Sequence, residues 1–240
     1  MKRKWVLLKI TLLLAGLIFL LSFSQRQYEL RDVQEVVKVI NYANGNHFIP
    51  EKAVDSILRK SHPDYPHMQM KRVDPREMEY LLIQDDYISY ANVYLDLNGS
   101  LYTEVHQETP VLRIKQDTEQ YYISESGKKL PLSTEYSPRV LIADGDIEET
   151  EYNQLIELIK IINEDNLLKT LVIGIRKEKL NSFILLIDGG DYTLELGKLE
   201  NLKSKLKNFE VFHSEYIQKT AQMPYTKINL RFNNQIVASK

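Results

Sequence analysis

Hydrophobic residues are concentrated at the start of the chain, in one run over residues 5–23 that only Lys9 interrupts. The positions just before it, residues 2–4, are all basic. A basic start, a single apolar segment and then a polar sequence form the pattern of an export signal whose positive end stays in the cytoplasm. We therefore expect most of the chain to lie outside the cytoplasm.

The length of this run fits both a removable signal and a membrane anchor. Crossing a bilayer takes about 20 apolar residues, whereas a cleavable signal has a core of roughly 7 to 15. Residues 10–23 are short for a span, but residues 5–8 extend them if the side chain of Lys9 reaches the headgroups. The triplet Ser22-Phe23-Ser24 would suit a signal peptidase. The pattern leaves both alternatives open, and a buried helix of a soluble protein is the third.

Beyond the run, the spacing of apolar residues predicts a small α/β module. β-branched residues over 36–40 predict a strand, and apolar positions three and four apart over 53–58 predict a helix behind Pro50. Residues 74–77, Asp-Pro-Arg-Glu, have the composition of a helix start, with an N-cap, a first-turn proline and an acid three positions on. Alternation on both sides of Gly99 then predicts a hairpin. The predicted order is strand, helix, helix, strand, strand.

The parity of the alternation selects the loop of this hairpin. A two-residue turn would place Leu95 opposite Tyr102 and put the two apolar rows on opposite faces of the sheet. A three-residue loop over 97–99, closed by a left-handed Gly99, places Leu95 opposite Leu101 and brings both rows to one face. We therefore expect the three-residue loop.

From residue 111 onward, strands dominate the pattern. Apolar and β-branched runs predict the strands, and two stretches with helical spacing predict helices. The predicted strands lie at 111–114, 121–124, 140–142, 171–175, 183–187, 192–196 and 227–232, and the predicted helices at 152–162 and 199–209. We expect a mixed, mainly antiparallel β domain with two helices, which makes the protein α+β as a whole.

Composition narrows the classes of function. The 240 residues include 31 Lys and Arg and 33 Asp and Glu, and four of the bases lie in the first nine positions. The exported part therefore carries 27 bases against 33 acids, which disfavours nucleic acid as a partner. The absence of cysteine excludes disulfides, thiolate zinc sites and a cysteine nucleophile.

Two clusters invite a chemical interpretation. His62 and His67 flank Asp64 in a proline-bounded loop, where a metal or acid–base site is conceivable, but their spacing matches no zinc signature and a solvated loop is simpler. The acidic segment over 144–149 has a glycine in the wrong place for an EF-hand loop, and an acidic helix start explains it. We expect no catalytic residue, no metal ligand and no cofactor.

Two surface features admit a binding role. Tyrosine is enriched at interfaces, although half-buried sheet faces favour it anyway; five tyrosines crowd the module, at Tyr80, Tyr87, Tyr90, Tyr94 and Tyr102. Lys203, Lys205 and Lys207 lie opposite the apolar stripe of the last predicted helix. We expect these lysines to face solvent, with anionic lipid as the alternative.

The last apolar segment, Ile236-Val237-Ala238, predicts a strand at the end of the chain. A terminal strand often lies at a sheet edge, where unpaired N–H and C=O groups accept a strand from a partner. Natural edges are usually protected by charge or proline, and this segment contains neither. It is therefore either paired within the domain or open to a partner.

The order of elements and several strings resemble the FtsQ/DivIB family of bacterial cell-division proteins. The strings are Val105-His106-Gln107-Glu108-Thr109-Pro110-Val111-Leu112-Arg113, Tyr121-Tyr122-Ile123-Ser124-Glu125-Ser126-Gly127 with Leu130-Pro131-Leu132, and Ile228-Asn229-Leu230-Arg231-Phe232. The resemblance implies a short cytoplasmic end at 1–4, a transmembrane anchor at 5–24, a POTRA-type module at 33–110 and a β domain at 111–240.

The resemblance also implies partners. In the family, the POTRA module helps recruit the protein to the division site, and the terminal part of the β domain binds the small single-span division proteins FtsB and FtsL. Carried onto this chain, the partner-binding residues are Tyr225, Arg231, Phe232, Gln235, Ile236, Val237 and Ala238. This placement agrees with the unprotected terminal strand.

The function expected from the sequence is a non-enzymatic scaffold of the divisome that assembles or regulates septal peptidoglycan synthesis. It would sit in the cytoplasmic membrane as a single-pass protein, with its N-terminus in the cytoplasm and its bulk outside, in the periplasm of a Gram-negative cell. We expect no small-molecule substrate. The alternative is a POTRA-containing transport or assembly factor of the cell envelope, and a secreted hydrolase using His62, Asp64 and His67 is the third reading.

Overall fold

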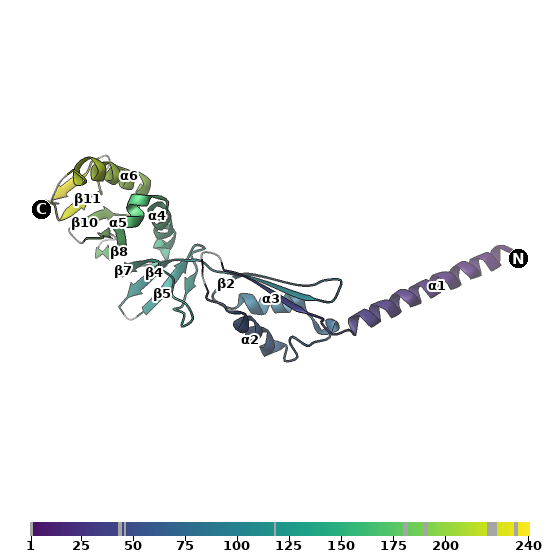
Figure 1. Cartoon of the computed structure of the whole chain (residues 1–240). Helices are drawn as coiled ribbons and strands as arrows, with labels where there is room; N and C mark the ends of the chain where they lie inside the picture. Colours follow the sequence, from purple (N-terminus) through teal and green to yellow (C-terminus); the bar gives the residue numbers. More distant parts are fainter. Residues whose placement is uncertain are drawn as a thin grey trace. The chain divides into compact units, whose positions relative to one another are not determined.

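The computed structural model describes residues 2–42, 45, 47–117, 119–179, 182–189, 192–219, 225–232 and 235–240. The chain divides into two compact units, Met1–Gln107 and Glu108–Lys240 (Figure 1). We call residues 32–107 the module and residues 108–240 the β domain.

The apolar run forms helix α1, which extends over Lys2–Glu29. Its segment Lys9–Gln27 is long and apolar enough to cross a membrane, and none of that segment is buried against the rest of the protein. At 1.5 Å per residue the helix is about 40 Å long, which matches a hydrocarbon core with both of its headgroup regions. The triplet Ser22-Phe23-Ser24 lies inside regular helix.

The module has the predicted order of elements. They are β1 (Val36–Asn41), α2 (Glu51–Ser61), the 3-10 helix η2 (Met70–Arg72), α3 (Pro75–Ile83), β2 (Ile88–Leu95) and β3 (Leu101–Gln107). The sheet order is β1-β3-β2, in which β1 runs parallel and β2 antiparallel to the central strand. Fully buried residues of the two α-helices and of β3 form the core: Val54, Leu58, Met78, Leu82, Leu101 and Val105.

The helix start and the hairpin loop predicted for the module are both found in the structure. The Asp74 side chain caps α3 by accepting hydrogen bonds from the main-chain N–H groups of Arg76 and Glu77, at 3.1 and 3.2 Å. In the hairpin, Leu95 pairs with Leu101, and Gly99 has a φ of 92°. The three-residue loop is therefore confirmed, and the apolar rows share one face.

The β domain is built on one sheet. Its strands are β4 (Pro110–Gln116), β5 (Glu119–Ser124), β6 (Lys129–Leu130), β7 (Leu141–Asp144), β8 (Val172–Glu178), β9 (Ser182–Ile187), β10 (Thr193–Gly197), β11 (Lys227–Asn229) and β12 (Val237–Ser239). Among the described residues the order is β12-β11-β10-β9-β8-β7-β4-β5-β6. The pairs β4–β7, β7–β8 and β10–β11 are parallel and the others antiparallel, so the sheet is mixed and mainly antiparallel as predicted.

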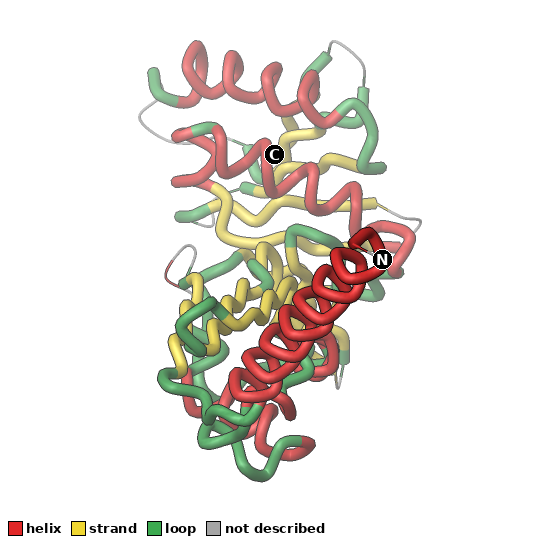
Figure 2. The backbone as a smooth tube through the Cα atoms, turned by 90° about the vertical axis from the view of Figure 1, so that its right-hand side faces the viewer, coloured by secondary structure: helices red, strands yellow, loops and turns green. Residues whose placement is uncertain are grey.

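Helices lie along one side of these strands (Figure 2). They are η3 (Glu149–Glu151), α4 (Tyr152–Glu164), α5 (Asn166–Leu171), α6 (Leu202–Phe212) and the π-helical turn η5 (His213–Ile217). Buried residues of α4, α5 and α6 join those of the strands in one hydrophobic core. We call the sheet face away from this core the open face.

Several details differ from the prediction, which also lacked the two-residue strand β6. The short helix α5 was not predicted; the side chain of Asp165 starts it by accepting a 2.8 Å hydrogen bond from the N–H of Leu168. The last long strand ends at Asn229 rather than at 232. The ladder with β10 ends at the hydrogen bond from the Leu230 N–H, because the next N–H, that of Arg231, donates to the Asn229 side chain at 2.9 Å instead of to a neighbouring strand.

Candidate partner-binding edge

The two edges of the large sheet differ in how they are protected. β6 has two residues and is followed directly by Pro131, which are both common ways of blocking an edge. β12 pairs with β11 through Val237–Asn229, Ala238–Ile228 and Ser239–Lys227, and no described strand lies on its other side. The terminal strand is therefore paired on one side and open on the other.

Side chains of the terminal segment divide between the two faces. Ala238 lies opposite Ile228, a fully buried core residue, and Ile236 packs partly buried against the same core. Val237 lies opposite Asn229 on the open face and is 37% exposed, while Gln235 is exposed. Of the four residues predicted to bind a partner at 235–238, Ile236 and Ala238 therefore hold the strand against the core. Gln235 and Val237 are the two that remain exposed.

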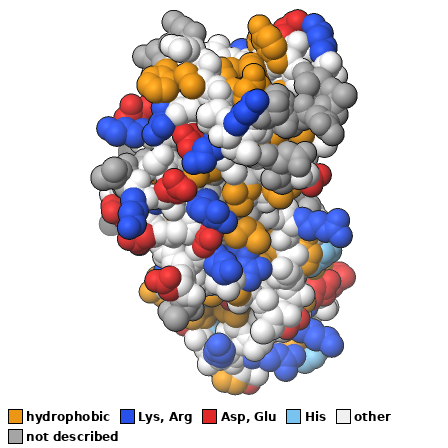
Figure 3. All heavy atoms as spheres, turned by 90° about the vertical axis from the view of Figure 1, so that its left-hand side faces the viewer, with side chains coloured by type: hydrophobic (Ala, Val, Ile, Leu, Met, Phe, Trp, Pro, Cys, Tyr) orange, Lys and Arg blue, Asp and Glu red, His pale blue; other side chains and the backbone are white. Residues whose placement is uncertain are grey.

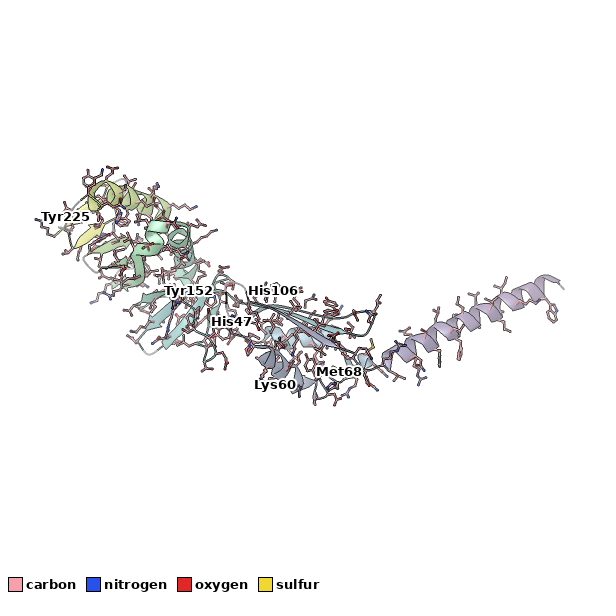
Figure 4. All side chains as sticks on the ribbon, in the orientation of Figure 1. His47, Lys60, Met68, His106, Tyr152 and Tyr225 are labelled. Carbon is pink, nitrogen blue, oxygen red and sulfur yellow. The ribbon has the colours of Figure 1, made fainter. Side chains whose placement is uncertain are left out.

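The remaining predicted residues flank β11. Tyr225 precedes this strand, is half-buried, and lies at the end of the β domain that carries the C-terminal strands (Figure 4). The next residue, Thr226, donates its N–H to the carbonyl of Ser239 at 2.9 Å, which continues the ladder. Phe232 follows the strand and is 52% exposed. The structure brings the predicted residues to one end of the sheet.

A polar cluster on the open face, missed by the sequence reasoning, fixes one of these residues. Glu195 of β10 lies 3.1 Å from the guanidinium of Arg231 and 3.6 Å from the ammonium of Lys227, and it accepts a 3.0 Å hydrogen bond from the Asn229 amide. Arg231 Nε also donates to Asn229 Oδ1 at 3.1 Å. Alternation with the buried Leu194 and Leu196 is the signal that could have placed Glu195 outside the core, but its partners are more than 30 positions away in the chain.

The backbone at Gly197 makes room for Arg231. A Cβ at this position would lie 2.6 Å from Cγ and 2.9 Å from Cδ of Arg231, and the φ of Gly197 is 67°. The absence of a side chain therefore lets the arginine lie flat across the end of β10.

Charge at this end of the sheet is predominantly positive. The side chains of Lys227 and Arg231 are 60% and 50% exposed, whereas their shared carboxylate on Glu195 is 17% exposed. On the face of the molecule seen in Figure 3, hydrophobic side chains are interspersed with Lys and Arg and also with Asp and Glu. An extended segment could therefore bind the main chain of β12 while its side chains meet apolar and basic groups.

One of the three lysines of α6 is not where the sequence analysis placed it. Lys205 is buried, and its ammonium donates hydrogen bonds to the carbonyls of Leu196 and Lys198, both at 2.8 Å. Burial lowers the pKa of this lysine. Lys203 and Lys207 are exposed, and Lys207 pairs with Glu210. Lys205 thus links α6 to the connection that joins β10 to it.

The two clusters considered for chemistry do not assemble into a site among the described residues. His62 and Asp64 line a polar hollow of about 150 Å³ in which Asp64 pairs with Arg72, while His67 lines a different one. No group of three or more metal-ligating side chains occurs in the described part of the chain. In the acidic segment, Glu148 and Glu151 form a capping box at the start of η3, as the helix-start reading predicts.

Comparison with known proteins gives two family matches. Residues 109–239 match the family model described as FtsQ/DivIB, C-terminal related, and residues 33–106 match that of a POTRA-like domain. No curated protein matches the chain. A solved structure of the major extracytoplasmic domain of the bacterial cell division protein DivIB from Geobacillus stearothermophilus aligns at 11% identity with a TM-score of 0.34, over 47% of this chain and 97% of that one.

Proposed function

Because the chain belongs to the FtsQ/DivIB C-terminal-related family, we propose that it is a non-enzymatic, membrane-anchored scaffold of the cell-division machinery. It acts by holding partner proteins outside the cytoplasm, where it assembles or regulates septal peptidoglycan synthesis. The observation that carries the proposal is the free edge of β12, which no described strand covers and which no proline or internal charge protects.

The partners are FtsB-like and FtsL-like single-span division proteins. A segment of such a partner extends the sheet by pairing with β12, and main-chain hydrogen bonds supply the affinity. Selectivity comes from the side chains around the strand: the exposed Phe232 and Val237 offer apolar contact, and Arg231 is held in one position for a polar one.

α1 keeps this scaffold in the membrane, with the basic residues before it in the cytoplasm and the module and β domain outside. A retained helix suits a scaffold because its partners are themselves single-span proteins. Their binding segments and β12 are then confined to the same side of one membrane, which raises their effective concentration.

The POTRA-like match of residues 33–106 also suits an envelope transport or assembly factor. Depletion of the protein in cells distinguishes this function from that of a division scaffold. The scaffold predicts that depleted cells elongate without dividing, and that the full chain restores septa. A chain with an altered β12 edge, such as the variant Val237→Asp, should reach the membrane but fail to restore division. Normal septation in depleted cells would overturn the proposal, and a loss of outer-envelope or secreted proteins with normal septa would assign the chain to transport.

A further inference from the structure

The most exposed large apolar side chain of the described residues lies outside α1, at the tip of the β2–β3 hairpin. Leu97 is 94% exposed, compared with 74% for Leu13, which is the most exposed of those in α1. Single exposed leucines are common on soluble surfaces. What distinguishes Leu97 from such residues is its position within the module.

The hairpin loop is built to present Leu97. The carboxylate of Asp96 accepts hydrogen bonds from the N–H groups of Asn98 and Ser100, at 2.9 and 2.7 Å. Gly99 turns the chain with a φ of 92°. The position that a Cβ would take on Gly99 lies against the Met70 side chain. Hydrogen bonds within the loop and the contact of Gly99 with Met70 thus hold the loop in one conformation, with the leucine side chain at its apex.

The topology of the module places this apex next to the anchor. β1 leaves the α1 junction and runs parallel to β3, with Val36 level with Leu101, so the loop that precedes β3 must lie at the junction end of the sheet. Direct hydrogen bonds join the two regions: the N–H of Gln34 donates to the carbonyl of Gly99 at 3.0 Å, and the N–H of Leu101 donates to the carbonyl of Glu35 at 2.8 Å. This neighbourhood does not depend on how the module is tilted at its junction with α1.

The segment that leads into η2 is hydrogen-bonded to the chain at the same end of the module, the end that α1 joins. The N–H of Met70 donates to the carbonyl of Arg31, and that of Val33 to the carbonyl of Met68, both at 2.9 Å. Met68 and His106 lie at opposite ends of the module in Figure 4, with Met68 at the end that α1 joins. The hairpin tip, residues 68–72 and the end of α1 therefore form one surface, which we call the membrane-proximal end.

Basic groups accompany the leucine on this surface. Arg26, Arg31 and Lys71 are exposed, and Arg26 and Lys71 line one hollow together with Leu30, which is 52% exposed. Of the carboxylates here, Asp64 pairs with Arg72, and Asp96 accepts N–H groups of its own loop, whereas Asp32 and Glu35 are exposed. An apolar tip beside cations that lack an ion pair among the described residues suits the boundary between lipid headgroups and acyl chains.

We propose that the membrane-proximal end is a second membrane contact, in which Leu97 enters the outer surface of the bilayer while Arg26, Arg31 and Lys71 lie at anionic lipid headgroups. α1 ends in the headgroup region by its length, and Gln34, which follows soon after α1 in the chain, is hydrogen-bonded to Gly99 of the hairpin loop. This contact fixes the orientation of the module on the membrane. The proposal rests on α1 as an anchor and does not depend on the partner edge of β12.

The chain contains no cysteine, so a single spin label can report the depth of any position. The full chain, reconstituted in vesicles of phosphatidylethanolamine and phosphatidylglycerol, is labelled at Leu97→Cys, and the accessibility of the label to oxygen and to a water-soluble nickel chelate is measured. Tyr42→Cys is the matched control, because Tyr42 is exposed just beyond Asn41, at the far end of the same sheet. Leu17→Cys, within α1, verifies the anchor.

The proposal expects the label at 97 to be oxygen-accessible and protected from nickel, like the label at 17, while the label at 42 is in water. Reversing the charge of Arg31 and Lys71 together should move the label at 97 toward water and leave the one at 17 unchanged. A label at 97 as aqueous as the one at 42 overturns the proposal, and protection that appears only in cell membranes would assign the tip to a protein partner. An aqueous label at 17 would instead remove the anchor itself.

Discussion

The carboxylate of Glu195 lies 3.1 Å from the guanidinium of Arg231 and joins β10 to the chain that follows β11. The same pairing is reinforced in the main chain, where the N–H of Leu230 donates to the carbonyl of Glu195 at 2.9 Å. Because β11 has only three residues, this cross-strand contact helps to hold β11 and the two residues after it, Leu230 and Arg231, against β10. The proposed partner edge thus depends on a residue that lies outside it.

Replacing Glu195 with glutamine should lower the free energy of unfolding of the β domain by about 1–2 kcal/mol, because two ion pairs to a largely buried carboxylate are lost. Denaturant titration measures the change. The matched control is Glu215→Gln, which removes the exposed pair with Lys219 and should cost under about 0.5 kcal/mol. Equal costs for the two variants would contradict a stabilising role for the cluster.

Substituting alanine at Gly197 should destabilise the β domain and displace Arg231, because the new Cβ would overlap its side chain. Gly189→Ala is the control, since Gly189 also has a positive φ, of 89°, but nothing lies within 4 Å of its Cβ position. The backbone penalty of about 1 kcal/mol is shared, so the difference in stability isolates the contact with Arg231. The account fails here if both alanine variants unfold at the same denaturant concentration.

The buried Lys205 predicts a dependence of stability on pH. Burial lowers its pKa in the folded protein below the ordinary value of 10.5. Between these two pKa values the unfolded chain binds more protons, so stability rises with pH in that window. Unfolding free energies of the protein and of Lys205→Met, measured up to pH 10.5, should therefore diverge in favour of lysine as the pH rises. A constant difference would show that the lysine titrates normally in the folded state.

A retained anchor predicts that the mature protein keeps its first 24 residues. The triplet Ser22-Phe23-Ser24 lies inside α1, and the helix continues past it to Glu29. N-terminal sequencing and intact mass of the protein from membranes should give the uncleaved chain, which high salt or carbonate does not release. A mature protein that begins at Gln25 would mean that the apolar run is a removable signal.

Sequence patterns predicted the elements of both units because each depends on neighbours in the chain. The alternation around Gly99 was enough to choose the hairpin loop, and Asp74 with Pro75 was enough to place a helix start. α5 was missed because its six residues are too few to show helical periodicity.

Contacts between distant residues account for what the patterns missed. By sequence, Lys205 lies on the polar side of α6. In the structure it is nevertheless buried, because its ammonium donates hydrogen bonds to two carbonyls of the β10–α6 connection. Among the predicted partner-binding residues, Ile236 and Val237 look alike in sequence, and only the pairing with β11 shows that the first packs on the core and the second faces outward. Sheet order, which made β12 an edge, is likewise a property of long-range pairing.

The central claim, that partners bind at β12, is tested most directly by a matched pair of charge substitutions at the two edges of the sheet. Val237→Asp alters the exposed face of β12, and Leu132→Asp alters a side chain of similar exposure beside β6, at 41% against 37%. Both variants should keep the stability of the unaltered protein. Co-purification with the FtsB-like and FtsL-like proteins should fall about tenfold or more for Val237→Asp, which corresponds to at least about 1.4 kcal/mol of binding, and stay unchanged for Leu132→Asp. Undiminished co-purification of a folded Val237→Asp variant would contradict the account.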